Sequence, residues 1–138
     1  MVAGAARLNS RHKLSQLAAA LEESGLVILG AFHPAPDDDI ALPAGRRGAG
    51  TIVLAGNGGG SMWPSFAASR GAGPDALNEW SRELFQALAE RFGAAAMLPQ
   101  DGPPYPPFQR LALRGGEVHA SPIGILIHPQ YGLWHSYR

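Results

Sequence analysis

The chain has 138 residues, of which 46% are hydrophobic and 16% charged, a balance typical of a globular domain. Eleven basic side chains offset eleven acidic ones, which argues against nucleic-acid binding. The absence of cysteine excludes disulfides, thiolate catalysis and any iron–sulfur cluster held by these residues. No apolar run approaches the roughly 18 residues of a membrane helix. We therefore expect one cytoplasmic domain, spanning 1–138, that contacts neither nucleic acid nor membrane.

An amphipathic helix is predicted in the first 25 residues. Leu14, Leu17 and Leu21 recur at helical spacing, Ser10 is suited to the N-cap, and Gly25 is suited to the left-handed conformation that ends a helix. Apolar runs then predict strands at 26–32, 51–56, 94–98 and 121–129. The last of these is apolar throughout, so it is expected to be covered on both faces.

A longer helix is predicted after Pro74, which suits a first helical turn, and it is expected to stop at Gly93. The apolar residues of this helix lie along one face: Leu77, Trp80, Leu84, Leu88 and Phe92. The proline-dense segment 99–108 cannot form regular structure, and 109–114 is too short to assign. Helices and short strands therefore alternate, which predicts a mixed α/β (α+β) layer packing.

The glycine-rich segment AGNGGGS (55–61) follows a predicted strand. It lacks the lysine of a P-loop and the acidic residue of a dinucleotide fingerprint. Two interpretations stay open: a plain strand-to-helix loop, or a loop whose backbone amides approach a ligand's phosphate or amide groups. The three aspartates at 37–39 are read as a solvated loop. The five histidines lack metal-ligand spacing, so no metal site is expected.

The C-terminal stretch IGILIHPQYGLWHSYR (123–138) combines an apolar run, a turn and several aromatic side chains. Flat rings with a few polar tips suit a broad planar ligand such as a flavin or a corrin. The alternative is a structural turn followed by an amphipathic edge strand. A third interpretation uses His128 or His135 as acid–base groups near neutral pH in a small-molecule enzyme.

This stretch resembles the segment I-x-G-x-x-I-H-P-x-F/Y-G-x-W-x-x-x-R of the CblC-type cobalamin-processing reductases. The matching residues are Gly124, Ile127, His128, Pro129, Tyr131, Gly132, Trp134 and Arg138. The Gln109–Arg110 pair is similar to the family's aromatic-Gln-Arg segment. A looser resemblance links the chain to epoxyqueuosine reductases and to bacterial ferredoxin-like proteins, in which such a domain precedes a cysteine-rich iron–sulfur module.

The resemblance implies an antiparallel sheet flanked by helices, similar to the flavin-dependent nitroreductase fold and often dimeric. It implies a bound cobalamin or FMN, with electrons exchanged through an iron–sulfur donor. The implied cofactor-binding residues are Gln109, Arg110, Gly124, Ile127, His128, Tyr131, Gly132, Trp134, Tyr137 and Arg138.

One departure from the CblC-type pattern affects the chemistry: Ala120, Ser121 and Pro122 stand where that family carries a basic residue. Glutathione transfer is therefore not expected. We expect the chain to be the N-terminal part of a longer protein whose iron–sulfur module lies outside it. The expected function is a cofactor-binding domain of a cytoplasmic ferredoxin-like reductase. The alternative is a non-catalytic module for dimerisation or for docking an iron–sulfur protein.

Overall fold

The computed structural model describes residues 2–3, 10–40, 43 and 50–138. A five-stranded antiparallel sheet forms the middle layer, with strand order β2-β3-β1-β4 and with β7 paired to β3. The strands are β1 (Val2–Ala3), β2 (Val27–Phe32), β3 (Thr51–Gly58), β4 (Ala94–Ala95) and β7 (His135–Tyr137). A separate two-stranded sheet pairs β5 (His119–Ala120) with β6 (Leu126–Ile127).

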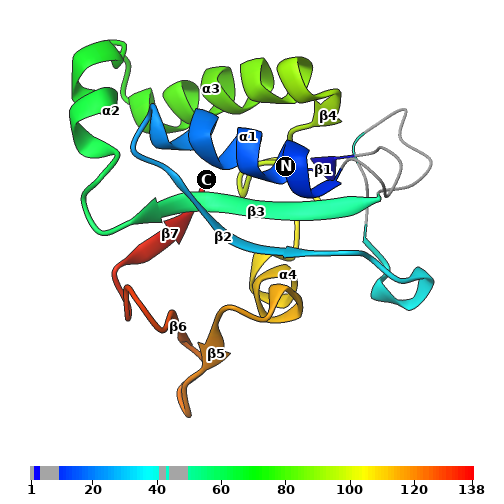
Figure 1. Cartoon of the computed structure of the whole chain (residues 1–138). Coiled ribbons are helices and arrows are strands. Elements are labelled where there is room, and N and C mark those ends of the chain that lie inside the picture. The colour runs from blue at the N-terminus through cyan, green and yellow to red at the C-terminus, as the bar shows by residue number, and fades with distance from the viewer. Residues whose placement is uncertain (1, 4–9, 41–42, 44–49) are drawn as a thin grey trace.

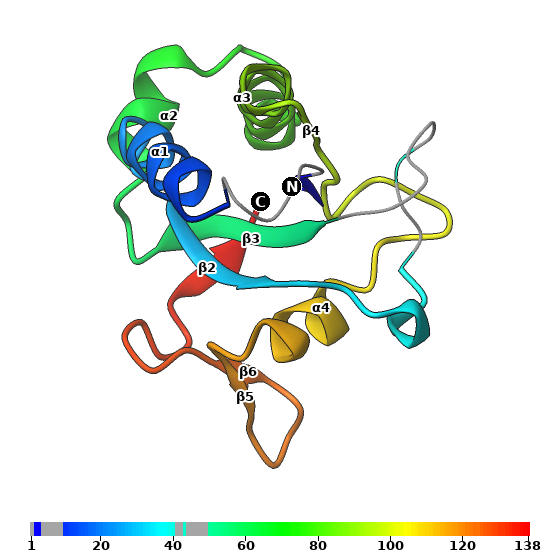
Figure 2. The same ribbon diagram turned by 45° about the vertical axis from the view of Figure 1, so that its right-hand side comes forward.

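Helices lie on both faces of the main sheet (Figures 1 and 2). One face carries α1 (Ser10–Glu22), α2 (Trp63–Ser69) and α3 (Ala76–Phe92), and the other carries α4 (Phe108–Gly115). A short 3₁₀ helix, η2, spans Pro36–Asp38. The structure thus confirms the predicted α+β class. Within the described residues, no helix is both long and apolar enough to cross a membrane.

The sheet separates two hydrophobic cores. The larger one joins α1, α2 and α3 to the sheet and contains Leu21, Phe66 and Phe85. The smaller one lies between the sheet and α4 and contains Ile52 and Leu111. From Ile52 to Gly58, every residue of β3 is buried. A central strand covered on both faces reads as a continuous apolar run, which is why its sequence predicts it well.

Most predicted elements of the first hundred residues are confirmed, with changes at their ends. Gly25 and Gly93 follow α1 and α3 at positive φ angles of 70° and 63°, as helix-ending glycines do. Pro74, however, precedes the first turn of α3, because Asp75 occupies the N-cap. The predicted strand 94–98 shortens to Ala94–Ala95.

The prediction of a buried strand at 121–129 is wrong. Only Leu126 and Ile127 form a strand, His128 makes a single bridge to Gly132, and Ile123 is 80% exposed. The reason is local: Gly124 has a positive φ of 79° and donates to the Ser121 carbonyl at 2.9 Å, so a tight turn interrupts the apolar run. The unassigned segment 109–114 belongs to α4, which buries Leu111 and Ala112 against the sheet.

Candidate functional site

Two segments singled out in the sequence, the glycine-rich 55–61 and the C-terminal 128–138, meet in the folded chain. Strand β7 pairs antiparallel with the end of β3, which sets Gly56 opposite Tyr137 and Gly58 opposite His135. The contact continues on both sides of this ladder. The Gly59 amide donates to the Trp134 carbonyl at 2.7 Å, and the Arg138 amide donates to the Ala55 carbonyl at 3.0 Å. We call this junction the C-terminal site.

Five rings follow one another along the C-terminal site. Their order is Phe108, Tyr137, His135, His128 and Tyr131. Consecutive ring centroids are 6.2, 5.7, 5.7 and 4.8 Å apart, distances at which aromatic rings attract one another. The row starts on α4 and ends at the turn after His128. It therefore ties the C-terminal segment to the smaller core.

His128 closes the turn that follows it. Its backbone exchanges two hydrogen bonds with Gly132, at 2.9 and 2.8 Å, and Gly132 adopts a positive φ of 60°. Its ring nitrogen Nδ1 accepts from the backbone amides of Gln130 and Tyr131 at 3.1 and 3.4 Å. An acceptor nitrogen carries no proton, so the neutral ring of His128 holds its proton on Nε2.

His135 has the opposite arrangement. Its Nδ1 lies 3.0 Å from the Gly132 carbonyl, and because a carbonyl only accepts, this nitrogen carries the proton. Its Nε2 is then the basic nitrogen. The two neighbouring imidazoles, 5.7 Å apart, therefore present one Nε2 that donates and one that accepts. Such a pair suits a ligand group that has both a donor and an acceptor.

Burial sets the electrostatics of the C-terminal site. Desolvation lowers the pKa of His128, the nearby His135 lowers it further, and Glu117 acts in the opposite direction. Burial also raises the pKa of Tyr137. The hydroxyl of Tyr137 is buried and has no hydrogen-bond partner within the described chain. Most buried polar groups are paired, so this unpaired hydroxyl is an exception within the C-terminal site.

The backbone of the glycine-rich loop is not covered by side chains of its own, and two tryptophans contact this loop. A methyl group on Gly58 would overlap the ring of Tyr131, so this ring packs directly on the strand. A methyl group on Gly60 would meet Cζ2 of Trp134 at 3.9 Å, and the Trp63 amide donates to the Gly60 carbonyl at 3.1 Å. Both tryptophans are exposed, Trp134 to 71%. The indole of Trp134 thus stands next to the loop, whereas Trp63 contacts the loop through its backbone amide.

Asn57 is a member of the C-terminal site that sequence reasoning missed. It is buried, its amide donates to the Gly59 carbonyl at 3.1 Å, and its Oδ1 accepts from Nε of Arg138 at 3.1 Å. It joins the glycine loop to the C-terminal arginine. Burial lowers the pKa of Arg138. An asparagine inside a glycine-rich run reads as a turn residue, so the sequence held no signal of this role.

Four other predicted site residues, Gly124 among them, lie outside the row of rings. Gln109 donates from Nε2 to the Gly124 carbonyl at 2.6 Å, which attaches the β5–β6 hairpin to α4. Ile127 sits in that hairpin opposite His119. Arg110 lies elsewhere, because its guanidinium donates to the Asp39 carbonyl at 3.0 Å. The predicted Gln-Arg pair is therefore divided between two regions.

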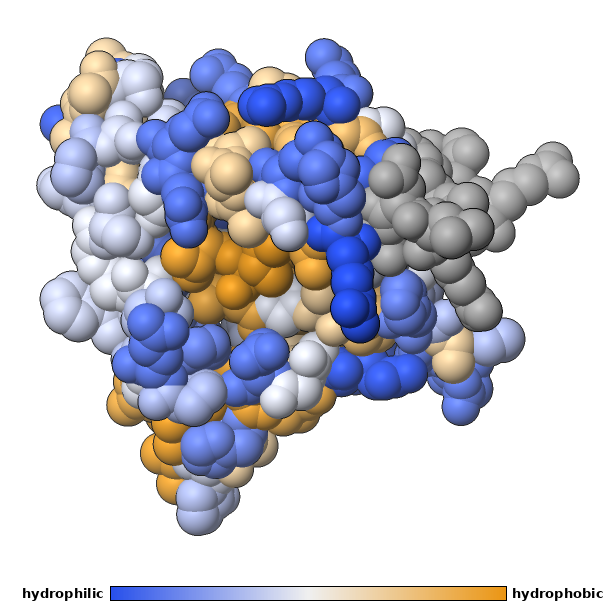
Figure 3. Space-filling view, in the orientation of Figure 1, coloured by the Kyte–Doolittle hydropathy of each residue, from blue (hydrophilic) through white to orange (hydrophobic). Residues whose placement is uncertain are grey.

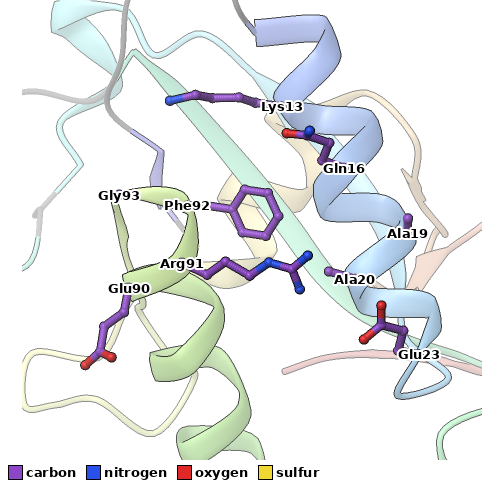
Figure 4. A pocket seen from close by; sticks show the side chains of 9 residues that line it. All are labelled: Lys13, Gln16, Ala19, Ala20, Glu23, Glu90, Arg91, Phe92 and Gly93. Atoms are coloured by element: carbon purple, nitrogen blue, oxygen red, sulfur yellow. The ribbon is translucent and has the colours of Figure 1, made fainter.

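Two surface clefts formed by described residues lie away from the C-terminal site. One, of about 660 Å³, lies between α1 and the end of α3 and is lined by Lys13, Gln16, Arg91 and Phe92 among others (Figure 4). The other, of about 380 Å³, lies at residues 70–76. In the part of the chain that the structure describes, no three His, Asp or Glu side chains are grouped to hold a metal.

No protein-family model, curated protein or solved structure matches this chain.

Proposed function

We propose that this chain is a cofactor-binding domain of a cytoplasmic ferredoxin-like reductase and that it binds a corrinoid or a flavin at the C-terminal site. The observation that carries the proposal is the exposed indole of Trp134 beside the bare backbone of Gly60. An antiparallel sheet flanked by helices agrees with a nitroreductase-like or CblC-like fold. Exposed indoles are favourable surfaces for large planar rings.

The surroundings of Trp134 support a planar ligand of low charge. Residues 50–69 and 118–137, which form most of the C-terminal site, contain no Asp, Glu, Lys or Arg. The adjoining Arg138 supplies a cation for a phosphate or a polar amide at the rim of the ring. The glycine backbone of the loop lets a broad ring approach closely.

In this proposal the cofactor carries the electrons. The protein binds and orients it: Trp134 supports one face of the ring, and Asn57 holds Arg138 in place. His128 and His135 present one donor and one acceptor nitrogen, an arrangement able to hold a proton at the edge of the C-terminal site.

A spectroscopic titration tests the proposal. We expect hydroxocobalamin or FMN, mixed with the purified chain, to change its visible spectrum and to quench the fluorescence of the exposed tryptophans. The third tryptophan, Trp80, is buried and serves as an internal reference. No spectral change with either compound at high micromolar concentration would overturn the proposal.

A matched pair of variants locates the binding surface. Trp134→Ala is expected to weaken cofactor binding by about 1–3 kcal/mol, the range measured when an aromatic platform for a stacked base is removed. Tyr105→Ala removes an equally exposed aromatic ring outside the C-terminal site and is expected to leave affinity unchanged. Equal affinities of both variants and the unmodified chain would exclude a stacking role for Trp134.

A second function, docking of an iron–sulfur protein, is favoured by the β5–β6 hairpin. Ile123, Ile125 and Leu133 are large apolar side chains exposed on or beside it, and side chains of this kind gather at protein interfaces. On titrating a purified ferredoxin into the labelled chain, we expect amide chemical-shift changes concentrated at 121–126. An unchanged spectrum there would exclude the hairpin as a ferredoxin-docking surface.

A further inference from the structure

The cleft between α1 and the end of α3 has the size of a small-molecule site. Its volume is about 660 Å³, and such sites measure about 300–1,000 Å³. Residues 90–93 form its α3 side. Its α1 side is one flank of that helix, because the lining residues recur at helical spacing. They are Lys13, Gln16, Ala19, Ala20 and Glu23.

An aromatic ring lies in the middle of this cleft. Phe92 is half-buried and packs against the larger core, which fixes the position of its ring. The ring lies between the side chains of Lys13 and Arg91 in the close view (Figure 4). The guanidinium of Arg91 is 5.3 Å from the ring centroid, within the range of a cation–π contact. The space-filling view shows apolar atoms between α1 and α3 with hydrophilic side chains around them (Figure 3).

The charges that face the cleft favour an anion. Neither Lys13 nor Arg91 forms an ion pair with any residue that the structure describes. Of the two acidic residues in the lining, Glu90 points away from α1 (Figure 4). Glu23 lies about 15 Å from Lys13 along the helix, at the other end of the flank. Two cations and one carboxylate therefore face the cleft, and this net charge of one suits a ligand with a single negative charge.

Helix stability does not account for Lys13. The first turn of α1 carries Arg11, His12 and Lys13 and no acidic residue, and no Asp or Glu precedes Glu22 in the sequence. Cations near a helix N-terminus are destabilising. Helix α3 has the favourable order, with Glu79 in its first turn and Arg91 in its last. An anion bound in the cleft would offset the unfavourable position of Lys13.

We propose that this cleft binds a small aromatic carboxylate. The aromatic ring of the ligand packs on Phe92, at the distances that aromatic pairs prefer. Its carboxylate pairs with Lys13 or Arg91, and a guanidinium can hold a carboxylate through two parallel hydrogen bonds. The side-chain amide of Gln16, on the same flank, is a further donor for the carboxylate. The cleft shares no residue with the C-terminal site, so this inference does not depend on the proposed function.

Three probes, titrated into the isotopically labelled chain and followed by amide chemical shifts, separate the two contributions. Naphthalene-2-carboxylate has both the ring and the charge, naphthalene-2-carboxamide has the ring alone, and acetate has the charge alone. We expect the naphthalene carboxylate to shift amides at 13–23 and 90–93 in a saturable manner. The carboxamide and acetate should each bind at least about tenfold more weakly. Added salt should weaken only the binding of the carboxylates.

Charge-neutralising variants assign the binding to named side chains. Lys13→Gln and Arg91→Gln are each expected to weaken binding of naphthalene-2-carboxylate about tenfold and to leave binding of the carboxamide unchanged. Lys13→Gln removes a cation from a helix N-terminus and should not unfold α1. The matched control is Arg11→Gln, which neutralises an exposed cation of the same helical turn outside the cleft. It is expected to bind the carboxylate as the unmodified chain does.

Three results would overturn the proposal. The first is the absence of shifts at 13–23 and 90–93 with naphthalene-2-carboxylate at millimolar concentration, including the case in which shifts occur only at the C-terminal site. The second is equal affinity for the carboxylate and the carboxamide. The third is that Lys13→Gln and Arg91→Gln bind the carboxylate as tightly as Arg11→Gln does.

Discussion

The helical layer above the sheet and the C-terminal segment 117–138 are both rich in apolar residues. They differ in how much of their large apolar side chains is exposed. Phe85 of α3 is 2% exposed, whereas Ile123 and Leu133 are 80% and 65% exposed. In the first region, long helices pack continuous stripes of apolar side chains against the sheet. In the second, strands of two or three residues and three tight turns cannot cover their own side chains. Ile123 and Leu133 are thus left exposed because the elements next to them are too short to pack over them.

The buried side chains of the first region stabilise the fold, whereas the proposed binding site lies in the second region. The large fully buried side chains lie in the packed layers, while the exposed indole, the unpaired tyrosine hydroxyl and the two differently protonated imidazoles lie at the C-terminal site. Four experiments measure this division.

The largest effect is expected in the core. Phe85→Ala should lower the free energy of unfolding by about 3–5 kcal/mol, because it removes a fully buried ring and leaves a cavity. Ile123→Ala removes a comparably apolar but exposed side chain and should change it by less than about 0.5 kcal/mol. Chemical denaturation measures both. Similar losses in the two variants would contradict the division.

The second-largest loss of stability is expected at a contact between the two regions. Gly58→Ala should destabilise the fold by about 1–3 kcal/mol, since its methyl group meets the Tyr131 ring. Gly60→Ala is the matched control, because a methyl group there makes an ordinary contact with Trp134. If the two variants unfold at the same temperature, Tyr131 does not pack on β3 as described.

A smaller effect depends on pH. Because the pKa of His128 is lowered in the folded chain, the unfolded chain takes up a proton first as pH falls through the ordinary value of 6.5. Stability is expected to fall from there until the lower folded pKa is reached, and then to stop falling. Denaturation at several pH values measures the slope. His128→Gln should flatten this slope, and an unchanged slope in that variant would contradict the role of His128.

The smallest effect concerns the attachment of the hairpin. Gln109→Ala removes the bond to the Gly124 carbonyl and should cost about 0.5–1 kcal/mol, seen as faster hydrogen exchange of amides at 119–127. Global stability and exchange in α3 should be unchanged. Uniform acceleration across the whole chain would mean instead that Gln109 supports the core.

Sequence patterns predicted the first two-thirds of the fold well because the signals there are local. Leucine spacing and terminal glycines mark α1 and α3, and the central strand β3 is a continuous apolar run. The same reasoning failed at 121–129, where an apolar run looked like a buried strand. Ser121 and Gly124 form a turn there, and turn chemistry outweighed hydrophobicity.

The sequence by itself determined the helix ends, the apolar strands and the aromatic character of the C-terminal stretch, because each depends on residues close along the chain. Only the tertiary structure decided that β7 pairs with β3, which brings Asn57 to Arg138 and Trp134 to Gly60. It also placed Gln109 and Arg110 in two different regions and set β2 at the edge of the sheet formed by the described strands. Contacts between residues some 80 positions apart depend on how whole layers pack, so the local periodicity of the sequence does not predict them.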